Sequence, residues 1–102
     1  AINKSVRVLS MQVHLKVYGI LRGMTGELPE SLDISGHTIA DLINLLANKY
    51  GPKIKDELLD EKGDLDFAYA FFIKGERKTD IHAKIQDGDK IVITNILGGG
   101  NK

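Results

Sequence analysis

The chain has 102 residues, the size of a single domain with one core, and its 42% hydrophobic and 27% charged content is typical of a globular protein. The 14 basic residues equal the 14 acidic ones, so no net field attracts nucleic acid or an anionic membrane, and no apolar run reaches the roughly 18 residues that span a bilayer. The absence of cysteine excludes disulfides and thiolate chemistry, and without a secretion-type signal at the N-terminus we expect a cytoplasmic protein.

The first regular element is expected near Met11. Residues 1–10 precede it and are interpreted as an N-terminal extension or a cloning remnant. From Met11 to Tyr18 hydrophobic and polar side chains alternate, which predicts a half-buried strand. The glycines of segment 19–26 indicate a turn, and alternation resumes over 30–35. The two runs therefore predict a hairpin with a long loop.

The next segment is the clearest helix of the sequence. Thr38 can cap its N-terminus, with Asp41 close to the free amides of the first turn, and Gly51-Pro52 ends it. The residues that recur at helical spacing and form one apolar stripe are Ile39, Leu42, Ile43, Leu46, Ala47 and Tyr50. A short second helix is expected over 53–59, and the charged segment 60–66 is expected to be a solvated loop.

Two more strands complete the predicted order. Segment 67–74 is rich in aromatic and β-branched residues, which favours a strand. An irregular stretch over 79–86 and an Asp-Gly-Asp turn at 87–89 lead into a last strand over 90–95.

The order strand, strand, helix, strand, strand predicts an α+β fold, in which one main helix packs across one face of a mixed sheet of four to five strands. The first and last strands are expected to be parallel neighbours, because the helix-containing segment crosses between them.

Signatures of catalysis are missing. His14, His37 and His82 are isolated, and none has a second ligand at helical spacing, so no metal site is expected. No glycine-rich phosphate loop precedes a helix. Asp87 and Asp89 are explained by the tight turn around Gly88. We therefore expect a protein that is not an enzyme and binds no cofactor.

The C-terminal segment is the one unusual feature. The last strand runs through Ile96 and Leu97 into Gly98-Gly99-Gly100, so the folded domain is expected to span 11–97 and a flexible tail to span 98–102. Three glycines order poorly, but they form a narrow chain without side chains that can thread into a constricted partner site. Ile96 and Leu97 are candidate pocket-filling residues. A frayed terminus or a cloning linker is the alternative.

The sequence from Met11 to Gly100 resembles the ubiquitin-like sulfur carriers, namely the molybdopterin synthase small subunits and the thiamine-biosynthesis carriers, which share the β-grasp fold. The matching stretches are Tyr18–Arg22 with Thr25-Gly26, Thr38–Leu42, Ile73–Gly75 and Ile85–Ile91. The last stretch is the most specific, because in the family its Asp-Gly-Asp turn precedes the final strand. The usual spacing from that turn places the family's terminal glycines at Gly99 and Gly100.

The resemblance implies how such a protein acts. An activating enzyme uses ATP to adenylate the terminal glycine carboxylate, sulfur transfer makes a thiocarboxylate, and a second enzyme, such as the large subunit of molybdopterin synthase, consumes it. Strand alternation places His14, Phe72, Val92 and Thr94 on the face opposite the helix, with Phe72 and Val92 as an exposed apolar patch for partners. A loop or the N-terminal segment covering Phe72 is the alternative.

Two departures from the family pattern bear on this interpretation. Asn101 and Lys102 follow Gly100, so Gly100 has no free carboxylate until they are removed by a protease; a cloning artefact or loss of the chemistry are the other readings. The prolines common near the tail of molybdopterin carriers are absent, although the length fits that type better than the shorter thiamine type. A protein modifier joined to lysines through Gly100, or a β-grasp module without covalent chemistry, remain alternatives.

Overall fold

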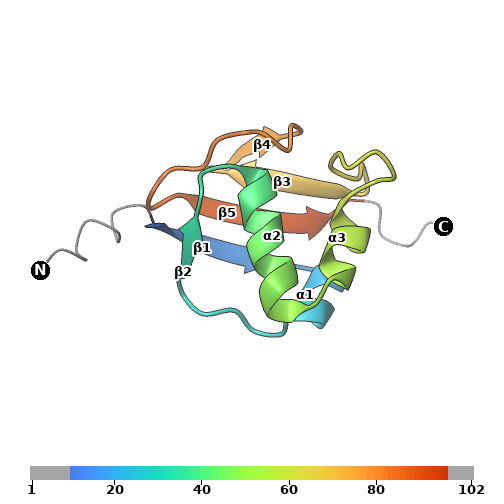
Figure 1. The fold of residues 1–102 in the computed structure, drawn as a ribbon, viewed down its shortest axis with the longest axis horizontal. Coiled ribbons are helices and arrows are strands. Elements are labelled where there is room, and N and C mark those ends of the chain that lie inside the picture. The colour runs from blue at the N-terminus through green and yellow to red at the C-terminus, as the bar shows by residue number, and fades with distance from the viewer. Residues whose placement is uncertain (1–9, 97–102) are drawn as a thin grey trace, which may run out of the picture.

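The computed structural model describes residues 10–96, and its elements follow one another in a β-α-β-α-α-β-β-β order. Their bounds are β1 Ser10–Val17, α1 Ile20–Thr25, β2 Leu32–Ser35, α2 Ile39–Tyr50, α3 Lys53–Leu58, β3 Tyr69–Ile73, β4 Glu76–Lys78 and β5 Lys90–Asn95. The five strands form one sheet, and α2 crosses one face of it (Figure 1). The expected mixed sheet with a main helix across one face is thereby confirmed.

The sheet has the order β2-β1-β5-β3-β4. β1 and β5 are parallel, with Leu15 opposite Ile91, while all other neighbours are antiparallel. The parallel pair lies at the centre, as expected for strands joined through a helix-containing crossover. Consequently β1 and β5 end at the same edge of the sheet, and β3, which is antiparallel to β5, begins there.

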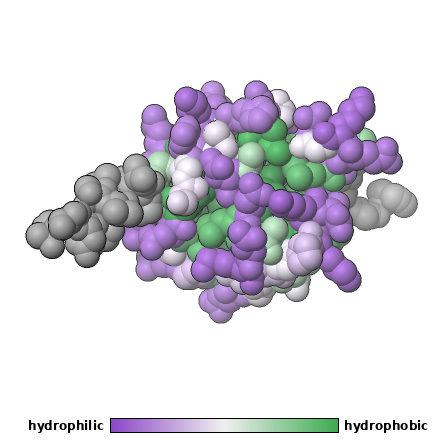
Figure 2. All heavy atoms as spheres, viewed as in Figure 1, coloured by the Kyte–Doolittle hydropathy of each residue, from purple (hydrophilic) through white to green (hydrophobic). Residues whose placement is uncertain are grey.

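The core fills the layer between the sheet and the helices. α2 contributes the predicted apolar stripe, and α3 contributes Ile54 and Leu58. From the sheet, Phe71 at the centre of β3 is completely buried. Figure 2 shows the helix-bearing side, where hydrophobic residues are partly visible among the hydrophilic side chains around them.

The structure corrects three of the sequence predictions and adds one strand. Segment 19–26, predicted to be a turn, contains α1, because Leu21 and Thr25 are buried one helical turn apart while Gly19 and Gly26 bend the chain at its ends. The second strand is confined to Leu32–Ser35, and β3 begins at Tyr69 instead of Phe67, which is 76% exposed. The chain after Gly75 turns back as β4, which pairs with β3.

The helices of residues 10–96 are all too short, and too polar, to cross a membrane.

Candidate functional site

The edge of the sheet where β5 ends is the place from which the glycine segment continues. β5 ends at Asn95, and the backbone N–H of Ile96 donates to the carbonyl of Ala68, 2.8 Å away, in the segment that leads into β3. Ile96 is thus held beside the start of β3, and its side chain is 44% exposed. Leu97 and Gly98–Gly100 lie outside the described residues.

Asn95 joins β5 to the start of α1. Its side-chain carbonyl accepts the N–H of Ile20 at 2.9 Å. Gly19 packs directly against the same oxygen, so closely that a Cβ atom at this position would overlap it. On its other side Asn95 lies opposite Tyr69 in the register of β5 and β3. The residue before Ile96 is therefore fixed to α1 as well as to the sheet.

Tyr69 links this edge to α3. Its phenol donates to the carboxylate of Glu57. Burial, together with the hydrogen bond to Glu57, raises the pKa of Tyr69 well above its ordinary value. The phenol therefore remains a neutral donor at physiological pH, and the contact holds α3 against the end of the sheet.

Four large hydrophobic side chains are exposed at this edge, and we name them the tail-root cluster. They are Tyr18 at 48% exposed, Ile20 at 53%, Phe67 at 76% and Ile96 at 44%. Tyr18 and Ile20 follow β1, Phe67 precedes β3 and Ile96 follows β5, so the strand directions bring all of them to one edge. Within residues 10–96 no large hydrophobic side chain outside this cluster is exposed. Such a gathering is typical of a protein-docking surface.

The sheet face opposite α2 carries the second set of predicted site residues. In the register, Val92 lies between Lys16 and Phe72, and Arg77 is the next neighbour of Phe72. Cross-strand neighbours share a face, so two cations flank an apolar centre. Phe72 and Val92 are half-buried rather than fully exposed, since neighbouring strands cover them on both sides. Thr94 continues the same face toward the tail.

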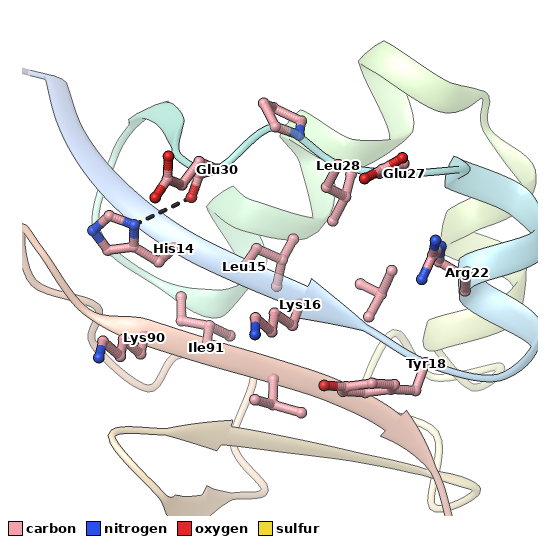
Figure 3. Close-up of a pocket in the computed structure, with 13 residues that line it drawn as sticks. His14, Leu15, Lys16, Tyr18, Arg22, Glu27, Leu28, Glu30, Lys90 and Ile91 are labelled. Carbon is pink, nitrogen blue, oxygen red and sulfur yellow. Dashed lines mark hydrogen bonds between the residues drawn. The ribbon is translucent and has the colours of Figure 1, made fainter.

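His14 lies on this face at the opposite end of β5, across from Lys90. Its side chain is exposed, and its ring Nδ1 is 3.2 Å from the carbonyl oxygen of Glu30 (Figure 3). His14 therefore contacts the loop before β2 and stands apart from the tail-root cluster.

The predicted site residues thus form two groups. His14, Phe72, Val92 and Thr94 share the open face, and Ile96 lies at the edge where β5 ends. Sequence reasoning missed Tyr18, Ile20 and Phe67. The predicted parallel pairing of the first and last strands could have located the first two, since residues just after those strands must meet at one edge.

No three His, Cys, Asp or Glu side chains gather into a possible metal site anywhere in residues 10–96.

Solved structures with this fold come from several organisms. No family profile matches the sequence, and no curated protein matches it. The small archaeal modifier protein 1 (SAMP1) of Methanosarcina acetivorans is 26% identical, with 89% of this chain and 98% of that chain covered and a TM-score of 0.66. A chain of the BexX/CysO complex of Amycolatopsis orientalis is 25% identical, with 86% and 99% covered and a TM-score of 0.70.

This chain has the β-grasp fold of the ubiquitin-like sulfur carriers. A Pyrococcus furiosus protein suggested to be subunit 1 of the molybdopterin converting factor has the same fold at 20% identity, with 83% of this chain and 97% of that chain covered and a TM-score of 0.61. The resemblance noted in the sequence is confirmed, and it supports a general sulfur-carrier or ubiquitin-like role.

Proposed function

We propose that this protein is a sulfur carrier for the biosynthesis of a molybdopterin-type cofactor. After removal of Asn101 and Lys102, the carboxylate of Gly100 is the group that receives the sulfur. The tail-root cluster is the observation that supports this proposal best. It lies at the end of the sheet where β5 ends, and from there the sequence reaches Gly98–Gly100 within a few residues. A partner that docks there receives the glycine segment into its own active site.

In this proposal the partner enzymes catalyse the reactions, and Gly100 is their substrate. In an activating enzyme, the Gly100 carboxylate attacks the α-phosphate of ATP, which gives an acyl-adenylate and releases pyrophosphate. The terminal sulfur of a partner's persulfide then attacks the acyl carbon and displaces AMP, which gives an acyl disulfide. A second thiol of that partner cleaves the S–S bond, so that Gly100 leaves as a thiocarboxylate and the partner is left with a disulfide. A second enzyme, equivalent to the large subunit of molybdopterin synthase, takes up that sulfur. The tail contributes a chain without side chains, which a narrow catalytic channel can surround.

The docking surface comprises the tail-root cluster and the adjoining open face. Phe72 and Val92 form the apolar centre of that face, with Lys16 and Arg77 on its flanks. Apolar contacts at the centre supply most of the binding energy, while the flanking cations favour a partner with acidic groups around its own apolar patch.

Kinetics with the chain ending at Gly100 test the docking surface. The activating enzyme of the same cells is assayed for pyrophosphate release with wild type, Phe67→Ser and Ile96→Ser. We expect the KM for each variant to rise about tenfold, because a contact at the centre of an interface is worth more than about 1 kcal/mol. kcat is expected to stay unchanged, since neither side chain reaches the reacting carboxylate.

The control is Asn48→Ser, an exposed change on α2 that should leave KM as it is. Urea unfolding checks that Phe67→Ser still folds, because an exposed side chain contributes within about 0.5 kcal/mol to stability. Wild-type KM values for both cluster variants would show that partners dock elsewhere.

A protein modifier is the second candidate function, since the fold is shared with SAMP1, whose name is that of a modifier. The same activated Gly100 would then be joined to lysines of target proteins. A blot of cell extract against this protein separates the two: a ladder of heavier conjugates indicates modification, whereas free protein bearing extra sulfur indicates a carrier.

A further inference from the structure

β1 loses its neighbour on one side half-way along its length. β2 pairs with the first half of β1, and its register with β1 ends at Val13 opposite Leu32. Beyond that point segment 27–30 runs apart from β1. A pocket of about 670 Å³ opens here, and it is lined by residues 14–18, Arg22, segment 27–30 and residues 90–92 of β5. Figure 3 shows Leu28 and Glu27 on one side of the β1 ribbon and Lys16 on the other.

The backbone of β1 is incompletely paired along this pocket. The amides of His14 and Tyr18 donate to Asp89 and Ile93, on the β5 side. Because successive residues of a strand direct their backbone groups to opposite sides, those of Leu15 and Val17 are directed to the pocket. Within residues 10–96, no pairing with β2 and no backbone hydrogen bond to a loop includes either residue.

These two residues are nevertheless buried. Leu15 and Val17 are each 4% exposed. Buried backbone groups in proteins are nearly always hydrogen-bonded, so a row of unpaired ones beside a pocket is a place for a partner. The volume is within the range of pockets that hold small ligands or a short peptide.

We propose that the free edge of β1 at Leu15–Val17 binds an extended segment of a partner protein by strand addition. The guest strand occupies the position that β2 leaves empty and pairs with the backbone groups of Leu15 and Val17. The site adjoins the docking surface, because Lys16 and Tyr18 also line the pocket. The proposed pairing itself uses the backbone of Leu15 and Val17, so it does not require that Gly100 carries sulfur.

The side chains around the edge specify the guest. Its central residue faces Lys16, whose side chain lies on the open face with that of Lys90 nearby in β5, so a carboxylate is favoured there. The two flanking residues point to the other face, toward Leu28 and the core, which favours valine or isoleucine. Glu27 and Glu30 on the far wall disfavour a second acidic residue. The preferred sequence is therefore apolar, acidic, apolar.

Hydrogen exchange on the whole protein tests the free edge. In the unbound protein the amides of Leu15 and Val17 should exchange at least about tenfold faster than those of Lys16 and Tyr18, which bond to β5. Equal protection of the four amides would show that the edge is already paired and would overturn the proposal.

Peptide titration tests the occupant. The probe is a capped Ser-Val-Glu-Val-Ser peptide added to isotope-labelled protein, with Ser-Val-Lys-Val-Ser as its charge-reversed counterpart. We expect the Glu peptide to bind with a Kd of about 1 mM, to move the amide resonances of Leu15 and Val17, and to slow their exchange about tenfold at ten times the Kd. Resonance changes confined to other parts of the protein, or none at several millimolar, would contradict it.

A charge swap tests the role of Lys16. Lys16→Glu should weaken the binding of the Glu peptide about fivefold and strengthen the binding of the Lys peptide about fivefold, as expected for opposed charges across two strands. The matched control is Lys49→Glu, an exposed change on α2 that should alter neither Kd. Unchanged peptide preference in Lys16→Glu would exclude the proposed pairing.

Discussion

At the scale of single residues, Gly19 and Asn95 decide how the end of β5 is joined to α1. Gly19 has a φ of +72°, which a side chain rarely adopts. The Asn95 oxygen that accepts the Ile20 N–H also occupies the space where a Cβ of residue 19 would lie. A side chain at this position must therefore adopt a strained backbone and also displace the group that anchors Ile20.

Gly26 provides a matched control, because it has the same φ of +72° but open space around it. We predict that Gly26→Ala lowers the free energy of unfolding by about 1–3 kcal/mol through backbone strain alone. Gly19→Ala should cost about 1 kcal/mol more, through the lost hydrogen bond. Urea denaturation measures both. In an Asn95→Ala background the excess should vanish, and its persistence would contradict this explanation.

Tyr69 gives the protein a specific alkaline sensitivity. Its pKa is raised in the folded protein, because of burial and the bond to Glu57. The folded state therefore holds this proton more tightly than the unfolded state, in which the pKa is about 10. The stabilising contribution of the protonated Tyr69 phenol is therefore fully present below about pH 10. It decreases as the pH rises above that value, because the unfolded state loses this proton first.

Tyr69→Phe should remove this pH dependence and lower the free energy of unfolding at neutral pH by about 0.5–1.5 kcal/mol. Unfolding curves between neutral pH and about pH 11 provide the measurement. If wild type and Tyr69→Phe lose stability in parallel over that range, the phenol is not responsible.

At the scale of elements, the start of α2 is fixed by a capping box. Asp41 accepts the backbone N–H groups of His37 at 2.8 Å and Thr38 at 3.1 Å, while the Thr38 hydroxyl oxygen accepts the Asp41 N–H at 3.3 Å. The bond from the His37 backbone is the largest cause that lowers the pKa of Asp41. These reciprocal bonds satisfy amides that the first helical turn leaves free.

Asp41→Ala should lower the free energy of unfolding at pH 7 by about 1 kcal/mol. Because the folded pKa is below the unfolded one, the wild-type advantage is present above about pH 4 and is lost as the pH falls through the folded value. Denaturation of both proteins at neutral pH and at about pH 2.5 checks this. A difference that persists unchanged in acid would show that the carboxylate charge is not involved.

The contrast between α2 and α1 shows what local sequence can predict. α2 was predictable because its cap, its apolar stripe and its glycine ending all indicate the same helix. α1 has only six residues, a glycine inside it and no side-chain cap. It forms because Leu21 and Thr25 are buried in the assembled fold, and that tertiary contribution leaves no periodic signal in so short a segment.

At the scale of the whole molecule, the directions of the strands were predictable, but the length and pairing of the outer strands were not. The crossover through α2 requires β1 and β5 to be parallel, and from this the location of the tail follows. The length of β2 and the pairing of β4 depend on register, which turns and packing set after the chain has assembled. Hence the half-buried state of Phe72 and the free edge at Leu15–Val17 became visible only in three dimensions.

The tail-root cluster and the glycine segment together form the proposed working end of the molecule. The exposed hydrophobic side chains are gathered where β5 ends, and the rest of the described surface is largely polar. Side chains that cost solubility and add nothing to the core are expected to be retained for binding.

The most direct test of the sulfur-carrier proposal is the intact mass of the protein purified from its own cells. We predict a species that ends at Gly100, part of which is heavier by the mass difference between sulfur and oxygen. That mass would establish both the removal of Asn101 and Lys102 and the thiocarboxylate. If every molecule retains Asn101 and Lys102, Gly100 has no carboxylate to activate, and the protein is instead a β-grasp binding module.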